Sequence, residues 1–402
     1  MKKMLPKRSE KMFVNFKFSA FLLMVVLILS CNHAPKAKEV KKVSDSTAVS
    51  TTSRISPVDS GTDDLVSFIS GVGSGKNKCQ PRLDSIIKWK NYAEELDSMF
   101  SHVNSGRCMK MRTWADSELI NSHSKTTVFY PFSGPDFFNA NIFYPNADQY
   151  ILIAMEPIGS LPDICKMSPD AVSNYLASIN NSMKDIFKRS YFITRKMSND
   201  LYRTKVNGTV PLISLFIKRT GHNIVSMQRI GVDSIGNYQI TDTLKSTKGI
   251  VSGIKIDFLT PPEKKIQSVL YFRADISDKG LEKIPGFKKY LNGLPQSFSY
   301  LKAASYLMHS ENFRDIRSLI FNKSLTILQD DSGIAYKFFD KQEWNIKLYG
   351  KYVKPKDEFS YIREPELEKA YKTSAFKPLP YSLGYNWGTD HVNMLYAVKK
   401  AK

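Results

Sequence analysis

The chain has few cysteines and few histidines for its 402 residues, and this limits the chemistry that we expect. Four cysteines are too few for a disulfide-dense scaffold, and no two of them form a Cys-x-x-Cys pair. The six histidines are scattered, so a zinc site of the usual ligand spacing is not expected. The sequence also contains no Gly-x-Ser-x-Gly, the turn that carries the nucleophile of α/β-hydrolases. We therefore predict neither a metal nor a cofactor.

Long hydrophobic runs are equally scarce, because only one occurs and it lies near the N-terminus. Residues 20–29 are all apolar, but this run is too short to cross a hydrocarbon core of about 30 Å as a helix. A multi-span membrane protein is therefore excluded. Basic residues precede the run and the small residue Ser30 follows it. This order predicts a secretory signal peptide over residues 1–30.

The segment Ile28-Leu29-Ser30-Cys31 resembles the lipobox of bacterial lipoproteins. The resemblance implies cleavage before Cys31 and attachment of fatty acyl chains, such as palmitate, to that cysteine and the new N-terminus. Several acyl chains would hold the protein firmly, since a single chain binds membranes only marginally. We therefore expect a lipid-anchored protein of the bacterial cell envelope, on the outer membrane if the cell is Gram-negative. An ordinary signal peptide with a chance cysteine, or an uncleaved anchor, is the alternative.

Three cysteines remain after this cleavage, namely Cys79, Cys108 and Cys165. An oxidising envelope favours a bridge between two of them. Cys79 and Cys108 are the nearest pair in the sequence, but spacing alone does not decide the connectivity.

Acidic residues are in the minority, with 38 Asp and Glu against 58 Lys and Arg. The basic residues are spread along the chain and no nucleic-acid-binding motif occurs, so a nucleic-acid partner is not expected. A basic protein outside the cytosol meets anionic lipids and anionic glycans. We expect the membrane as one partner and an anionic glycan or a small molecule as another. A solvated, lysine-rich surface is the simpler interpretation of the charge.

The composition divides the mature chain into a tether and a globular part. Residues 31–64 are rich in Ser, Thr and Lys and poor in large apolar residues, which predicts a flexible tether with a reach of roughly 30 Å. Residues 65–402 contain enough apolar side chains for a sizeable core. We expect one globular α/β domain there, or two lobes that divide near residues 245–265.

The hydrophobic periodicity predicts alternating helices and strands. Apolar residues recur at helical spacing over residues 86–103, after the capping sequence Ser168-Pro169-Asp170, and over about 300–320. Short apolar runs predict strands at 127–132, 150–155, 212–217, 269–276 and 325–328. Residues 224–257 alternate and predict antiparallel hairpin strands with a turn at Gly236-Asn237. The fold class that follows is α/β, with a mixed, largely parallel sheet flanked by helices and an antiparallel hairpin section.

The turn after the first strand is the most unusual local sequence. Ser133-Gly134-Pro135-Asp136 precedes a predicted helix, and Glu156 ends the next strand. This is the layout of a nucleotide-binding βαβ unit, in which an acid at the position of Glu156 binds the ribose. However, the turn has no Gly-x-Gly and Pro135 removes a backbone amide. We therefore favour a Gly-Pro turn in which Asp136 caps the helix.

Two other segments could contribute chemistry. Asp330 and Asp331 follow a strand, where adjacent carboxylates could bind a cation or divide acid and base roles. An Asp-Asp-Ser-Gly turn is the favoured interpretation. His391 lies in an aromatic-rich tail, and a hydrogen-bonded packing histidine is favoured there over a catalytic one.

Two stretches of the sequence resemble a group of uncharacterised bacterial envelope proteins, over about half of the mature chain. The residues that carry this resemblance are Tyr130-Pro131-Phe132-Ser133-Gly134-Pro135-Asp136, Glu156-Pro157 and Leu328-Gln329-Asp330-Asp331-Ser332-Gly333. The resemblance implies an envelope location and no particular activity.

These observations favour a lipid-anchored binding or interaction module. The alternative is an anchored envelope hydrolase or transferase that uses carboxylates at strand ends. In a parallel sheet, the turns after Ser133, Glu156, Asp275 and Asp330 would face one crevice. We expect at least two of Asp136, Glu156, Asp330 and Asp331 to share a pocket. The candidate site residues are Asp136, Glu156, Asp330, Asp331, Ser133 and His391, and the lipidation site is Cys31.

Overall fold

The computed structural model describes residues 60–73, 87–120, 124, 126–189, 206–241, 249–262, 265–355, 357–386 and 391–401. The predicted signal peptide, Cys31 and the tether up to residue 59 lie outside these residues. All described residues belong to one compact unit, Ile55–Lys402. No helix within the described ranges is long and apolar enough to cross a membrane.

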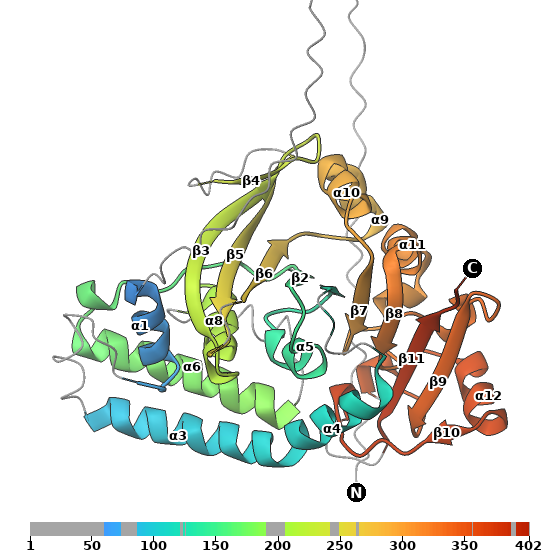
Figure 1. The fold of residues 1–402 in the computed structure, drawn as a ribbon, viewed down its shortest axis with the longest axis horizontal. Coiled ribbons are helices and arrows are strands. Elements are labelled where there is room, and N and C mark those ends of the chain that lie inside the picture. The colour runs from blue at the N-terminus through green and yellow to red at the C-terminus, as the bar shows by residue number, and fades with distance from the viewer. Residues whose placement is uncertain are drawn as a thin grey trace, which may run out of the picture. The chain divides into compact units, whose positions relative to one another are not determined.

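One mixed sheet of eleven strands organises the described residues (Figure 1). The strands are β1 (Thr127–Pro131), β2 (Gln149–Ala154), β3 (Asn223–Val232), β4 (Tyr238–Ile240), β5 (Val251–Leu259), β6 (Ile266–Arg273), β7 (Ser297–Leu301), β8 (Ser324–Gln329), β9 (Trp344–Gly350), β10 (Phe376–Lys377) and β11 (Asn393–Lys399). They lie in the order β10-β9-β11-β8-β7-β1-β2-β6-β5-β3-β4. The predicted α/β class with a mixed sheet is therefore confirmed.

The centre of the sheet is parallel, and antiparallel strands flank it on both sides, with one further parallel pair, β9 and β10, at one edge. Neighbours β8, β7, β1, β2 and β6 all run in the same direction. On the β6 side, β5, β3 and β4 continue the sheet as antiparallel strands, as the alternation over residues 224–257 predicts. On the β8 side, β11 runs antiparallel to both β8 and β9.

The strand order reverses between β1 and β7. From β1 the chain builds β2 and later β6 on one side, then crosses over and builds β7 and β8 on the other. The loops after β1 and β7 therefore leave the sheet in opposite directions, and a crevice opens between them at the carboxyl ends of the strands. Open α/β sheets bind their ligands at such a switch point.

Helices cover both faces of the sheet, and a separate hydrophobic core fills each face. The first core packs under α1 (Ser60–Ile69), α3 (Ile87–Val103), α4 (Met109–Glu118), α5 (Phe137–Phe143), α6 (Pro169–Arg189) and α8 (Val210–Arg219). The second packs under α9 (Asp278–Lys283), α10 (Pro285–Asn292), α11 (Arg314–Lys323) and α12 (Pro365–Thr373). Successive residues of β1 alternate between the two cores, with Val128 and Tyr130 in the first and Phe129 in the second. Burial on both faces explains the continuous apolar runs of the central strands.

Two of the predicted helices form as expected, and two other assignments are wrong. Helices α3 and α6 match the predictions, and the Ser168 hydroxyl caps α6 by accepting the amide of Ala171 at 3.3 Å. Residues 212–217, predicted as a strand, lie inside α8, whose residues 210–217 are all buried, and a short continuous apolar run does not distinguish a buried helix from a strand. The helix predicted from about residue 300 begins only at Arg314, because residues 297–301 form β7.

The predicted end of the tether is also wrong by a few residues. Helix α1 begins at Ser60, and its Asp63 carboxylate accepts hydrogen bonds from Lys218 Nζ and from the Ile224 amide, each at 2.7 Å. Residues 60–64 therefore belong to the folded domain. Near the other proposed boundary, at residues 245–265, β5 and β6 pair within the same sheet.

The cysteines do not form a disulfide between the two that are nearest in the sequence. Cys108 is free and buried, whereas Cys165 is disulfide-bonded. A bridge between Cys79 and Cys108 is therefore excluded.

Candidate functional site

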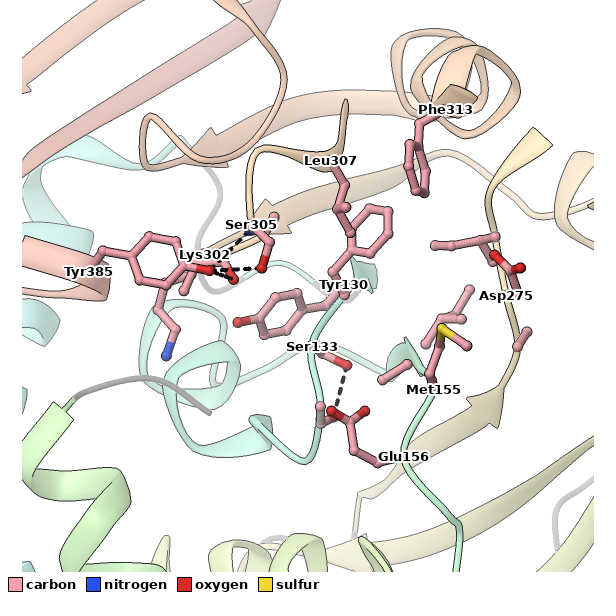
Figure 2. A pocket seen from close by; sticks show the side chains of 18 of the residues that line it. Tyr130, Ser133, Met155, Glu156, Asp275, Lys302, Ser305, Leu307, Phe313 and Tyr385 are labelled. Carbon is pink, nitrogen blue, oxygen red and sulfur yellow. Dashed lines mark hydrogen bonds between the residues drawn. The ribbon is translucent and has the colours of Figure 1, made fainter. Parts of the chain in front are cut away.

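A cavity of about 600 Å³ lies at the switch point, at the carboxyl ends of β1, β2, β6 and β7 (Figure 2). The turns after these four strands contribute to its walls, and the lining also includes Glu358, Phe359, Tyr361 and Tyr385. Three of the four segments that the sequence placed in one crevice, those at Ser133, Glu156 and Asp275, line this cavity. The prediction of a strand-end crevice is confirmed for these three.

Glu156 follows β2 and lines the cavity although it is only 2% exposed. Its backbone carbonyl accepts a hydrogen bond from the Tyr271 hydroxyl at 2.9 Å, which fixes the chain at this point. Among the described residues, no group hydrogen bonds to its buried Oε2 atom. A buried carboxylate oxygen without a partner is costly, so Glu156 is a ready acceptor for a donor inside the cavity.

Ser133 lies beside Glu156 at the edge of the cavity (Figure 2). Its amide donates to the Ile153 carbonyl at 3.2 Å and its hydroxyl donates to the Gly134 carbonyl at 2.9 Å. These bonds extend the β1–β2 pairing beyond the strand and fix the turn. The described lining contains no histidine or cysteine that could activate this hydroxyl as a nucleophile.

Asp136 is buried behind the cavity wall and does not line the cavity. One of its oxygens accepts the Asn139 amide at 3.2 Å, which caps α5 as predicted. The other accepts the Tyr130 hydroxyl at 2.9 Å and the Lys302 ammonium at 2.5 Å. Lys302 contributes its stem to the wall, but its ammonium points away from the cavity (Figure 2). Burial lowers the pKa of Lys302, and the Asp136 carboxylate opposes that shift.

Asp330, which follows β8, holds the turn after β7 by hydrogen bonds. Its carboxylate accepts the amide of Ser332 at 3.1 Å and the amide of Ala303 at 2.9 Å, and it also accepts the Ser332 hydroxyl. Burial raises the pKa of this carboxyl group. The favoured interpretation of Asp330 as a turn residue is therefore confirmed, and the turn also holds the neighbouring loop.

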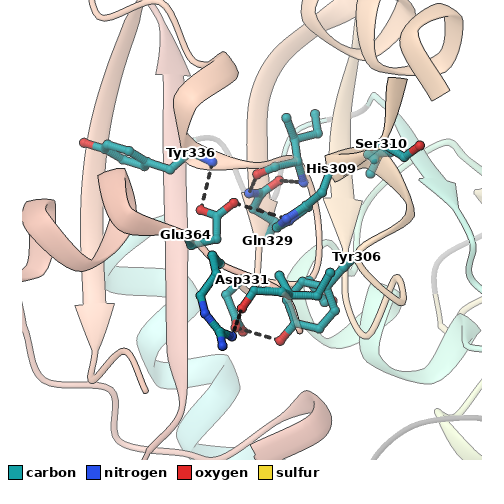
Figure 3. Close-up of polar contacts among 12 residues, drawn as sticks. Tyr306, His309, Ser310, Gln329, Asp331, Tyr336 and Glu364 are labelled. Atoms are coloured by element: carbon teal, nitrogen blue, oxygen red, sulfur yellow. Dashed lines mark hydrogen bonds and ion pairs between the residues drawn. The ribbon is translucent and has the colours of Figure 1, made fainter. Parts of the chain in front are cut away.

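Asp331 belongs to a second buried polar cluster, which also contains His309 and Glu364 (Figure 3). Asp331 accepts the Tyr306 hydroxyl at 2.8 Å, and burial together with the adjacent Asp330 charge raises its pKa. Glu364 accepts the Tyr336 amide at 3.1 Å and lies 3.2 Å from His309 Nδ1. Burial raises the pKa of Glu364 to about 7 and lowers the pKa of His309 to about 4.

Backbone strain is concentrated around the cavity. Among the described residues, four that are not glycine have a positive φ, and all lie in the turns after β1 and β7: Phe132 (61°), Ala303 (50°), Ser305 (54°) and Tyr306 (56°). Each such residue costs about 1–3 kcal/mol and persists only where its surroundings hold it. The Tyr385 hydroxyl does so here, because it donates to the Ala303 carbonyl at 2.9 Å and accepts the Ser305 amide at 3.1 Å.

Comparisons of the chain with protein-family models, curated proteins and solved structures give no match.

Only one of the four candidate acids lies in the cavity lining. The expectation that at least two would share a pocket is wrong for this cavity, because Asp136, Asp330 and Asp331 bind the chain's own amides, hydroxyls and lysine instead. His391 is also absent from the lining; it precedes β11. Among the described residues, no group of three or more His, Cys, Asp or Glu side chains is arranged to hold a metal ion.

The cavity combines an apolar wall with negative charge. Leu307 and Phe313 point into it opposite Glu156, and the Phe313 ring meets Phe132 edge to face at 5.8 Å (Figure 2). The carboxylates in the lining are Glu156, Asp275 and Glu358, and Lys302 is its one Lys or Arg among the described residues. Since Asp136 neutralises Lys302, the cavity suits a neutral or cationic molecule with a flat apolar part and hydrogen-bond donors.

Sequence reasoning did not single out several residues of this site. The sequence predicts a helix over about residues 300–320, and this segment contains four of the lining residues, Lys302, Ala303, Ser305 and Phe313. The Ser-Phe-Ser-Tyr-Leu sequence of β7 does alternate, and this was the signal that could have revealed a strand and its following turn.

Proposed function

We propose that this is a lipid-anchored protein of the bacterial cell envelope whose α/β domain binds a small organic molecule in the switch-point cavity. Glu156 carries the proposal, because it lines the cavity and its buried Oε2 atom has no hydrogen-bond partner among the described residues. The strained turns after β1 and β7 support it, since such strain is typical of binding and catalytic sites.

The envelope location has two supports. The lipobox-like segment ending at Cys31 follows a signal-peptide-like run. In addition, Cys165 is disulfide-bonded, which is common in oxidising compartments and rare in the cytosol.

The contacts of the acidic and hydroxyl side chains in the lining favour binding over catalysis. An anchored hydrolase or transferase would need a base close to a nucleophile or to an activated water. In the described lining, the Ser133 hydroxyl donates to a carbonyl, and no second buried carboxylate accompanies Glu156. An anionic glycan is a poor partner for this cavity because of its negative lining, so a small neutral or cationic molecule is the better choice.

The anchor is tested by replacing Cys31 with serine. We expect the Cys31→Ser protein to leave the membrane fraction or to accumulate as a precursor, because serine has no thiol to receive the lipid. Ser30→Ala is the matched control, since alanine keeps a small residue before the cleavage point. Cell fractionation and incorporation of labelled palmitate are the measurements. Equal palmitate incorporation in the wild type and Cys31→Ser would contradict the proposal.

The binding proposal is tested by screening the mature protein against a mixture of metabolites and oligosaccharides by native mass spectrometry. We expect a small molecule to be retained by the wild type and lost, by at least about tenfold in affinity, from Glu156→Gln, because a charge-assisted hydrogen bond disappears. Glu282→Gln, the same change at an exposed position on α9, should leave retention unaltered. Equal retention by wild type and Glu156→Gln, or failure of Glu156→Gln to fold, would mark Glu156 as structural.

A further inference from the structure

We infer that the molecule bound in the switch-point cavity is an unphosphorylated ribonucleoside. This inference rests on the proposed function and adds the chemical class of the ligand. It combines the position of Glu156 in the topology, the apolar wall opposite it, and the way in which the chain fills the place where a phosphate would bind.

Glu156 occupies the ribose position of a doubly wound sheet. In such sheets the chain runs from the first strand through a helix to a parallel second strand, and an acid at the end of that second strand accepts a ribose hydroxyl. Here β1, α5 and β2 follow this order, and Glu156 lies two residues after β2. Glu156 lines the cavity, and no group among the described residues hydrogen bonds to its buried Oε2, so a ribose hydroxyl that reaches this atom gains a strong acceptor.

The remaining walls suit a nucleobase. Phe132, Leu307 and Phe313 offer apolar and aromatic surface for a flat ring. Asp275, at the end of β6, supplies a carboxylate in the same lining that can accept hydrogen bonds from an exocyclic amino group.

A phosphate has no place to bind, because the chain's own carboxylate occupies it. In nucleotide-binding βαβ units the phosphate lies at the amino end of the first helix, against a glycine-rich turn. Here Asp136 accepts the Asn139 amide at that end of α5, and Pro135 offers no amide. Asp136 also neutralises Lys302, the one cation of the described lining. A phosphorylated ligand would therefore meet the acids and gain no compensating partner.

Isothermal titration of the full mature protein in detergent tests this inference. The probes are adenosine, guanosine, cytidine and uridine, with the 2′-deoxy and 5′-monophosphate forms of whichever binds most tightly. We expect at least one ribonucleoside to bind, and its 2′-deoxy and monophosphate forms to bind at least about tenfold more weakly. Glu156→Gln should weaken ribonucleoside binding by a similar factor, while Glu282→Gln should leave it unchanged.

Two results of this titration would contradict the ribonucleoside inference. A monophosphate that binds as tightly as its nucleoside, or a protein that binds none of the four nucleosides, would overturn the inference. Methyl glucoside and free ribose are included as other sources of neighbouring hydroxyl groups. If a saccharide binds and Glu156→Gln abolishes that binding, the proposed function stands and the nucleoside inference fails. If no probe or screened metabolite depends on Glu156, both fail.

Discussion

Replacing Lys302 with methionine is expected to lower the free energy of unfolding by about 3–5 kcal/mol, the usual cost of removing one partner of a buried ion pair. Methionine keeps most of the length of the side chain, so the loss comes from the charge. Asp136, only 1% exposed, would lose the lysine with which it forms its ion pair. Asp136 also interacts electrostatically with the Arg107 guanidinium, where it opposes the lowering of the Arg107 pKa by burial.

A double-mutant cycle separates the interaction between Lys302 and Asp136 from the other effects of each substitution. Asp136→Asn should also be strongly destabilising, because it removes the carboxylate charge that lies 2.5 Å from the buried Lys302 ammonium. The Lys302→Met/Asp136→Asn protein should be more stable than the sum of the two losses predicts, since neither charge remains. Urea unfolding at neutral pH measures all four proteins. Additive losses, or a loss below about 1 kcal/mol for Lys302→Met, would show that the pair contributes little.

The second large expected effect is a pH dependence of the free energy of unfolding that arises from Glu364. Burial holds the pKa of Glu364 at about 7, above its value in an unfolded chain. Between about pH 4.5 and 7 the folded protein therefore keeps a proton that the unfolded chain has released. The stability from this group is present at low pH and is lost as the pH rises through about 7. Relative to Glu364→Gln, the wild type should lose roughly 3 kcal/mol of stability between pH 4.5 and 7.5.

Glutamine is the matched replacement because it has the same shape and does not titrate. It can still accept the Tyr336 amide and donate to His309 Nδ1. The pKa of His309 is lowered to about 4, so this histidine contributes the opposite pH dependence in both proteins. Urea unfolding at several pH values is the measurement. A constant difference between the two proteins at every pH would mean that Glu364 is ionised throughout.

The sequence predicted the strand-end crevice because the central strands carry a clear signal. Strands β1, β2, β6 and β8 are buried on both faces, and their short apolar runs end at polar turns. Ser133, Glu156 and Asp275 follow three of these runs, and the parallel arrangement brings them to one edge. Strand β7 was missed because apolar residues at helical spacing continue past Leu301 into the following turn.

The sequence could not tell which acids the fold itself would use. Asp136 and Asp330 both follow strands, as Glu156 does, yet the first pairs with Lys302 and the second with the Ala303 amide. Lys302 meets Asp136 only because the chain crosses over from β6 to β7, beside β1, and the Ala303 amide meets Asp330 because β8 pairs with β7. The sequence also does not predict the positive φ angles of Ala303 and Ser305, since neither residue type favours that conformation.

The most direct test of the binding site is a crystal structure of the mature protein with the ribonucleoside that binds most tightly in the titration. We predict the ligand between the turns after β1 and β7, with a ribose hydroxyl within about 3 Å of the Glu156 carboxylate and the base against Phe313. A ligand bound elsewhere, with the switch-point cavity empty and Glu156 in contact with protein groups only, would contradict the assignment of this cavity as the binding site.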